Sequence, residues 1–123
     1  MATETKNLYL KLCKLDGLVG ELTYTENDWI AWRFNEHLCV KARLDSREGY
    51  IEINHGMTHY HPATDEIFDE LSDILYERTI FVSKVGIFGR YISGIYPREY
   101  FEKHIRRIKY GLAVRCVTSR RII

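Results

Sequence analysis

The sequence predicts an α+β fold: a mostly antiparallel sheet of about five or six strands, with two or three helices packed on one face. Three observations lead to this prediction. Apolar and polar side chains alternate in residues 30–34, 38–44 and 51–53, which is the pattern of half-buried strands. Turn-forming residues separate these runs at hairpin spacing. Two further stretches, residues 64–77 and the segment after Pro97, carry apolar residues at helical spacing.

Size and composition are those of one globular domain spanning residues 1–123, with 46% hydrophobic and 28% charged residues. No apolar run approaches the roughly 20 residues of a membrane span, and the first residues lack the apolar segment of a signal peptide. Cys13, Cys39 and Cys116 are far apart and odd in number, which indicates buried reduced thiols. We therefore expect a cytoplasmic protein that does not enter a membrane.

The leucines near the start of the chain fit two structures. Leu8, Leu12 and Leu15 fit one face of a short helix, but Leu8, Leu10 and Leu12 fit the alternation of a strand equally well. We favour a helix that ends near Gly17, followed by a connector or an edge strand over residues 18–25.

The three alternating runs predict an antiparallel meander. Asn35 and Glu36 separate the first two runs, and Asn tolerates the left-handed conformation of a tight turn. Residues 45–49 form a second turn before the third run. A meander of this kind has one buried face and one charged face.

The clearest helix signal runs from Thr64 to Glu77. Its apolar stripe is formed by Ile67, Phe68, Leu71, Ile74 and Leu75. We expect the Thr64 hydroxyl to cap the N-terminus, and Asp65 and Glu66 to place negative charge where the helix dipole favours it. The other face is rich in carboxylates, so it is either solvated or meets a basic surface.

After this helix, residues 79–85 and 88–95 are predicted as two strands, because β-branched and aromatic side chains dominate them. Pro97 then occupies the first position of another helix, which ends at Gly111. Its apolar stripe is formed by Phe101, Ile105 and Ile108, and its exposed ion pairs by Glu99 with Lys103 and Glu102 with Arg106. A last strand is predicted for residues 112–117.

The order of these elements is helix, meander, helix, two strands, helix, strand. It is loosely similar to the order found in bacterial secretion chaperones. The resemblance implies one alternative function, that of a homodimeric interaction or chaperone-like protein.

Charge is distributed unevenly along the chain. Residues 1–77 hold 7 Lys and Arg against 15 Asp and Glu, whereas residues 78–123 hold 11 against 2. The net charges are thus −8 and +9. This asymmetry indicates an anionic partner, or two segments that face each other.

The C-terminal segment interleaves cations with aromatic rings, a combination suited to phosphates and exposed bases. The candidate partner-binding residues are Arg98, Lys103, Arg106, Arg107, Lys109 and Tyr110. They predict a small non-enzymatic binding or regulatory protein, without a cofactor, whose basic surface engages an acidic protein or a nucleic acid. A second copy of the chain is a further candidate partner.

A histidine-rich segment supports a rival hypothesis. His59 and His61 point the same way on an extended chain, His55 could join them, and neutral imidazoles are common metal ligands. His59-x-His61 with Glu66 resembles part of the first metal motif of the cupins, although Ile53 stands where that motif has a glycine. The resemblance implies a metal-dependent enzyme that binds a divalent metal through His55, His59 and His61. Alternatively, these histidines flank a turn and form local hydrogen bonds or face solvent.

Overall fold

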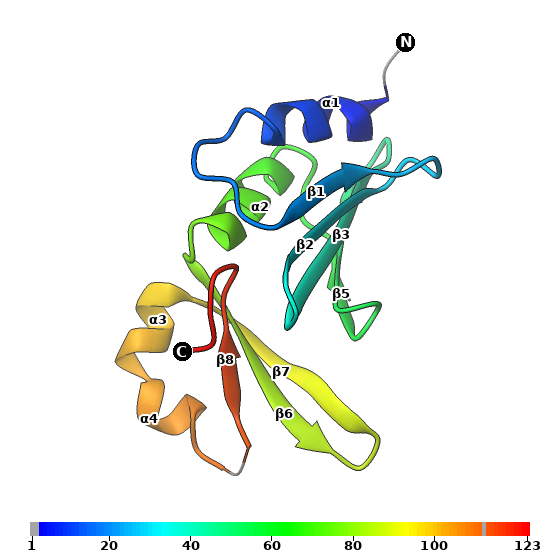
Figure 1. Cartoon of the computed structure of the whole chain (residues 1–123). Coiled ribbons are helices and arrows are strands. Elements are labelled where there is room, and N and C mark those ends of the chain that lie inside the picture. Colours follow the sequence, from blue (N-terminus) through cyan, green and yellow to red (C-terminus); the bar gives the residue numbers. More distant parts are fainter. Residues whose placement is uncertain (1–2, 112) are drawn as a thin grey trace.

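The computed structural model describes residues 3–111 and 113–123, and within them it contains four helices and eight strands (Figure 1). The predicted α+β class is confirmed, and the strands pair antiparallel throughout. The strands form two sheets, one of five strands in the order β1-β2-β3-β4-β5 and one of three in the order β7-β6-β8. No helix in the described ranges is long and apolar enough to cross a lipid bilayer.

The elements follow the chain in the predicted sequence, except that there is one additional strand and that the last predicted helix is divided into two. They are α1 (Glu4–Leu12), β1 (Glu21–Tyr24), β2 (Ile30–Asn35), β3 (Leu38–Leu44), β4 (Gly49–Ile53), β5 (Thr58–Tyr60), α2 (Ile67–Leu75), β6 (Thr79–Gly86), β7 (Gly89–Pro97), α3 (Arg98–Lys103), α4 (Ile105–Ile108) and β8 (Arg115–Val117). The N-terminal helix and the meander are confirmed, and β1 is an edge strand. The first hairpin turn falls on residues 36–37, one residue later than expected.

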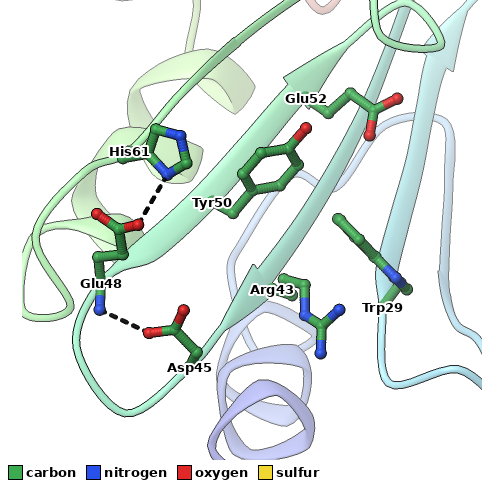
Figure 2. Close-up of a pocket in the computed structure, with 7 residues that line it drawn as sticks. All are labelled: Trp29, Arg43, Asp45, Glu48, Tyr50, Glu52 and His61. Carbon is green, nitrogen blue, oxygen red and sulfur yellow. Dashed lines mark hydrogen bonds and ion pairs between the residues drawn. The ribbon is translucent and has the colours of Figure 1, made fainter.

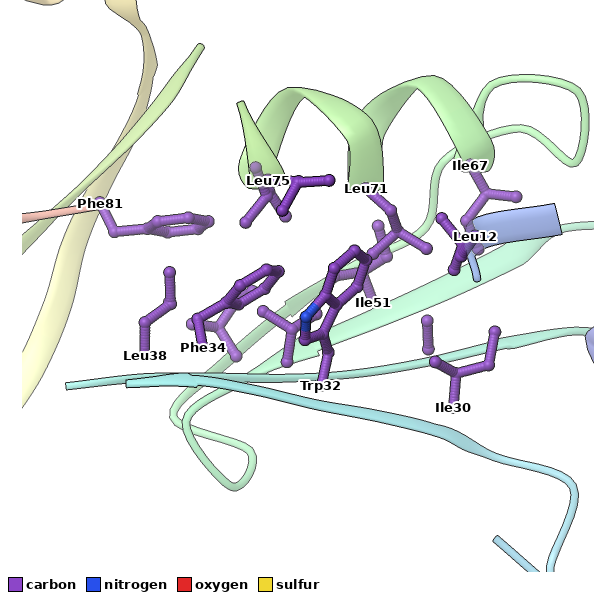
Figure 3. Packing of buried hydrophobic residues seen from close by; sticks show 14 of the residues in the cluster. Leu12, Ile30, Trp32, Phe34, Leu38, Ile51, Ile67, Leu71, Leu75 and Phe81 are labelled. Carbon is purple, nitrogen blue, oxygen red and sulfur yellow. The ribbon is translucent and has the colours of Figure 1, made fainter. Parts of the chain in front are cut away.

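The five-stranded sheet buries one face because its side chains alternate strictly. The residues that point inward are Ile30, Trp32, Phe34, Leu38, Val40, Ala42, Ile51 and Ile53. Helices α1 and α2 cover this face, and Figure 3 shows Leu71 and Leu75 of α2 over the rings of Trp32 and Phe34. The two rings stack with their centroids 4.4 Å apart. Burial of these apolar side chains supplies the main driving force for this half of the fold.

Helix α2 is shorter than predicted, and Thr64 does not cap it. Residues 64–66 form a turn in which the Glu66 amide donates to the Ala63 carbonyl, so the helix begins only at Ile67. At the other end Glu77 adopts a left-handed conformation with φ 60°. The Glu77 and Arg78 amides donate back into the last turn of the helix, which is the hydrogen-bond pattern of a Schellman motif.

Strand β6 contributes to two hydrophobic cores. Phe81 points into the main core, whereas Ile80 and Val82 point into a smaller core with Phe101 and Ile108. Alternate residues of a strand face opposite sides, so a strand buried on both sides needs a continuous apolar run. Residues 80–82 form that run. Beyond it, β6 and β7 extend as a hairpin away from the five-stranded sheet (Figure 1).

The predicted C-terminal helix is broken at His104, where φ is −121° and ψ is 21°. Pro97 is the last residue of β7 and precedes the helix, so the expectation that it occupies the first helical position is wrong. Beyond the break Ile105 is exposed, whereas Phe101 and Ile108 are buried as expected. The final strand is confirmed for Arg115–Val117, and Leu112 lies outside the described residues.

The three cysteines are free, but only Cys116 is buried. Cys39 is half-buried on β3, and Cys13 is exposed directly after α1. The prediction of buried thiols is therefore wrong for Cys13. The buried side of α1 is formed by Thr5, Leu8 and Leu12. Cys13 lies one position past the end of the helix and is not part of this buried side.

Candidate functional site

The residues predicted to bind a partner lie along one continuous stretch, from the first residue of α3 to just past α4. We call this the α3–α4 surface; it consists of Arg98, Lys103, Arg106, Arg107, Lys109 and Tyr110. All of these side chains are exposed except that of Arg98, which is half-buried. The phenol of Tyr110 is 82% exposed, an unusual degree for a large ring. An open hollow lined by residues 103–107 lies within this surface.

Charge within the α3–α4 surface divides into a compensated and an uncompensated part. Glu102 lies 3.1 Å from Arg98 and Glu99 lies 3.6 Å from Lys103, so Glu102 does not form the predicted pair with Arg106. Arg106, Arg107 and Lys109 form no ion pair with any Asp or Glu side chain among the residues that the structure describes. The cations around α4 are therefore not paired with carboxylate side chains of the described residues.

A row of aromatic rings borders these cations. Tyr96 and Tyr100 stack with centroids 5.5 Å apart and planes 5° from parallel, and the Tyr100 and His104 centroids are 4.3 Å apart. Arg107 joins the row, because its Nη2 donates to the Tyr100 hydroxyl over 2.8 Å. The sequence prediction omitted Tyr96, which lies on β7 and meets Tyr100 of α3 only where the strand passes into the helix.

Other cations of residues 78–123 neutralise the acidic part of the chain. Arg78 pairs with Asp73 at 2.7 Å, and Arg121 pairs with Glu77 at 3.1 Å. The buried hydroxyl of Thr118 donates to the same Glu77 carboxylate over 2.6 Å. The two oppositely charged segments thus face each other at this junction, as the sequence charges allow.

The structure brings His59 and His61 together but does not group His55 with them. The rings of His59 and His61 are 5.6 Å apart, and His61 Nδ1 lies 3.2 Å from a Glu48 carboxylate oxygen. His55 occupies the turn between β4 and β5 with φ 59°. Across residues 3–111 and 113–123, no group of three His, Cys, Asp or Glu side chains is arranged to hold a metal ion. The metal-dependent enzyme therefore stays a prediction to which the geometry adds no support.

A second surface, which sequence reasoning missed, lies on the outer face of the five-stranded sheet (Figure 2). We call it the aromatic hollow; it has a volume of about 470 Å³ and is lined by Trp29, Arg43, Asp45, Glu48, Tyr50, Glu52 and His61. The signal was present in the alternation, because positions flanking buried residues in a strand point outward. Which of these outward residues meet depends on cross-strand register, for example the pairing of Arg43 with Tyr50.

The tip of the β6–β7 hairpin is apolar and fully exposed. Ile87 and Phe88 are 95% and 103% exposed, between the paired residues Gly86 and Gly89. No Asp or Glu occurs in residues 79–98. The hairpin therefore combines an apolar tip with purely positive charge.

Taken together, these observations define a small α+β protein with two antiparallel sheets. Comparison of the chain with protein-family models, with curated proteins and with solved structures found no significant match. Function is therefore inferred from the side chains alone.

Proposed function

We propose that this chain is a small, non-enzymatic cytoplasmic binding protein whose α3–α4 surface engages single-stranded nucleic acid. One observation carries the proposal: the side chains of Arg106, Arg107 and Lys109 form no ion pair with an Asp or Glu side chain among the described residues, and Tyr110, which follows them in the chain, is exposed. Cations that no carboxylate side chain neutralises attract phosphates, and an exposed ring offers a stacking surface for a base. Free cysteines agree with a reducing compartment.

The electrostatic contribution comes from the uncompensated end of the surface. A phosphate that approaches Arg98 or Lys103 must compete with Glu102 or Glu99, so these two residues add little net attraction. Arg106, Arg107 and Lys109 face no such competition from an Asp or Glu side chain in the described residues, and Lys109 Nζ donates to the Ile123 carbonyl oxygen over 3.4 Å. If each contacts one phosphate, the logarithm of the binding constant should fall with the logarithm of salt concentration at a slope of about −2.

The aromatic contribution favours single strands over duplexes. Bases stack on protein rings only when they are unstacked from their neighbours, and one stacked base contributes about 1–3 kcal/mol. Tyr110 is accessible for this contact. Helix α4 spans only Ile105–Ile108, which is too short to act as a recognition helix along the major groove of a duplex.

Fluorescence anisotropy of a labelled, mixed-sequence single-stranded oligonucleotide tests the proposal. The triple variant Arg106→Ala/Arg107→Ala/Lys109→Ala should lose at least about tenfold in affinity at low salt, because three phosphate contacts are removed. The matched control is Lys6→Ala/Lys14→Ala/Arg47→Ala, which removes the same charge from three exposed positions elsewhere. The control should bind like the unaltered chain.

Two results would contradict the proposal. One is equal loss of affinity in the triple variant and its control, which would indicate attraction to net charge only. The other is binding of polyglutamate with no binding of the oligonucleotide, which would indicate an acidic protein as the partner. Replacing Tyr110 by Ala should weaken oligonucleotide binding at every salt concentration without changing the salt slope, since a ring carries no charge.

A further inference from the structure

We propose that the aromatic hollow binds a small organic cation, with an ammonium or guanidinium group placed against the rings of Trp29 and Tyr50. This proposal is independent of the α3–α4 surface. It rests on a hollow whose walls combine aromatic faces with an excess of negative charge (Figure 2). Both features attract cations, and they attract them additively.

The rings of the hollow are held in place by the sheet. Tyr50 lies on β4, and Trp29 directly precedes β2. The two rings meet edge to face, with centroids 5.4 Å apart and planes at 78°. Residues beside them, Ile30 and Ile51, are buried in the main core. The hollow is therefore supported by packed strands and needs little rearrangement to accept a ligand.

The hollow already holds one organic cation that belongs to the chain itself. The guanidinium carbon of Arg43 lies 5.0 Å from the centre of the Trp29 ring, within the range of a cation–π contact. Arg43 pairs across the strands with Tyr50, so register brings this cation to the wall of the hollow. This contact shows that the Trp29 ring in the wall of the hollow can accept a guanidinium group.

Negative charge in the hollow exceeds what Arg43 can neutralise. Asp45, Glu48 and Glu52 line it together with Arg43 and with His61, whose Nδ1 lies 3.2 Å from a Glu48 carboxylate oxygen. Backbone amides of Glu48 and Arg47 donate to Asp45 and hold the pKa of its carboxyl below the usual range, so Asp45 remains ionised. Glu52 forms no ion pair within the described parts of the chain. An incoming cation would meet this unmatched charge.

The size of the hollow sets the class of ligand. Its volume of about 470 Å³ lies in the range typical of small-molecule sites. An anion would be repelled by the carboxylates, and a neutral ring would leave their excess charge unmatched. A small molecule that bears a positive group satisfies both the rings and the carboxylates.

Tryptophan fluorescence offers a direct test with choline as the probe. Trp32 is fully buried in the core, so a ligand in the hollow should change the emission of Trp29 alone. Choline should give a saturable change, and its neutral isostere 3,3-dimethylbutan-1-ol should bind at least about tenfold more weakly, because it lacks the charge. Equal responses to the two compounds, or no saturable response to choline and to methylguanidinium, would overturn the proposal.

Variants of the carboxylates separate this site from general attraction of cations. Glu48→Gln/Glu52→Gln keeps the shape of the hollow and should weaken choline binding at least about tenfold. Glu21→Gln/Glu36→Gln removes the same charge from two exposed positions outside the hollow and should leave binding unchanged. Circular dichroism checks that both variants fold. Unchanged binding by the folded Glu48→Gln/Glu52→Gln variant would also overturn the proposal.

Discussion

The two sheets of this protein differ in charge, in core and in what they present to solvent. The five-stranded sheet, with α1 and α2, buries the larger core and belongs to the segment with net charge −8. The three-stranded sheet, with α3 and α4, buries a smaller core and belongs to the segment with net charge +9. Strand β6 contributes to both cores. The comparison teaches that two halves of opposite net charge can share a strand whose two sides serve different cores.

The largest effect is expected at the residue that links the two halves. Phe81→Ala removes a fully buried ring from the main core, next to Leu38 and Leu75 (Figure 3). The change should lower the free energy of unfolding by about 3–5 kcal/mol. Denaturant unfolding followed by circular dichroism measures this. A loss below about 1 kcal/mol would mean that the halves do not depend on Phe81 for their packing.

A smaller effect is expected at the polar junction between the halves. Thr118→Val leaves the Glu77 carboxylate, whose side chain is only 13% exposed, without its hydroxyl donor. We expect a loss of about 1.5–3 kcal/mol in the free energy of unfolding, because the lost hydrogen bond involves a charged group. Arg121→Ala is the matched comparison and should cost less than about 1 kcal/mol, since Arg121 is exposed. A larger cost for Arg121→Ala than for Thr118→Val would contradict this account of the junction.

A third change should stabilise the acidic half. Burial, together with Asp73 and Glu66, raises the pKa of the Glu70 carboxyl. A raised folded-state pKa means that this group favours folding at acid pH, and that the favourable contribution is lost as pH rises through the folded pKa. Glu70→Gln should therefore raise stability by a few tenths of a kcal/mol at neutral pH.

The pH profile checks the sign of this effect. The difference in melting temperature between Glu70→Gln and the unaltered chain should shrink as pH falls and disappear below about pH 4, where the carboxyl is protonated in both states. A destabilised variant at neutral pH would show that the Glu70 carboxylate makes a favourable contact that outweighs repulsion.

The smallest effect is expected at the hairpin tip, four strand positions beyond the core. Phe88→Ala removes a ring that is fully exposed, so the free energy of unfolding should change by less than about 0.5 kcal/mol. Calorimetry on Phe88→Ala and Phe81→Ala compares the same substitution in two environments. A large loss for Phe88→Ala would show that the tip is buried against another molecule in solution.

Much of the fold could be predicted from hydrophobic periodicity, but not its division into two sheets. Residues 80–82 predict a strand whether the protein has one sheet or two. A continuous apolar run does not reveal that the two faces of the strand pack into different cores. The Thr64 cap failed for a local reason, since the turn closed by Glu66 delays the start of the helix. The break at His104 has no Gly or Pro to announce it.

The two candidate surfaces also differ in how far they could be predicted from the sequence. The residues of the α3–α4 surface could be selected from the sequence because they are close together in the chain, although the break at His104 interrupts their helical spacing. The aromatic hollow could not, because Trp29, Tyr50 and His61 meet only through the register of separate strands. A periodic pattern specifies which face a residue occupies, but not which residue lies opposite.

The central claim, that single-stranded nucleic acid binds the α3–α4 surface and not the aromatic hollow, is tested most directly by an NMR titration. Addition of an unlabelled single-stranded oligonucleotide should shift the signals of Arg106, Arg107 and Tyr110 and leave the Trp29 indole unchanged. Shifts confined to Trp29 and its neighbours, or the absence of any shift at low salt, would contradict the claim.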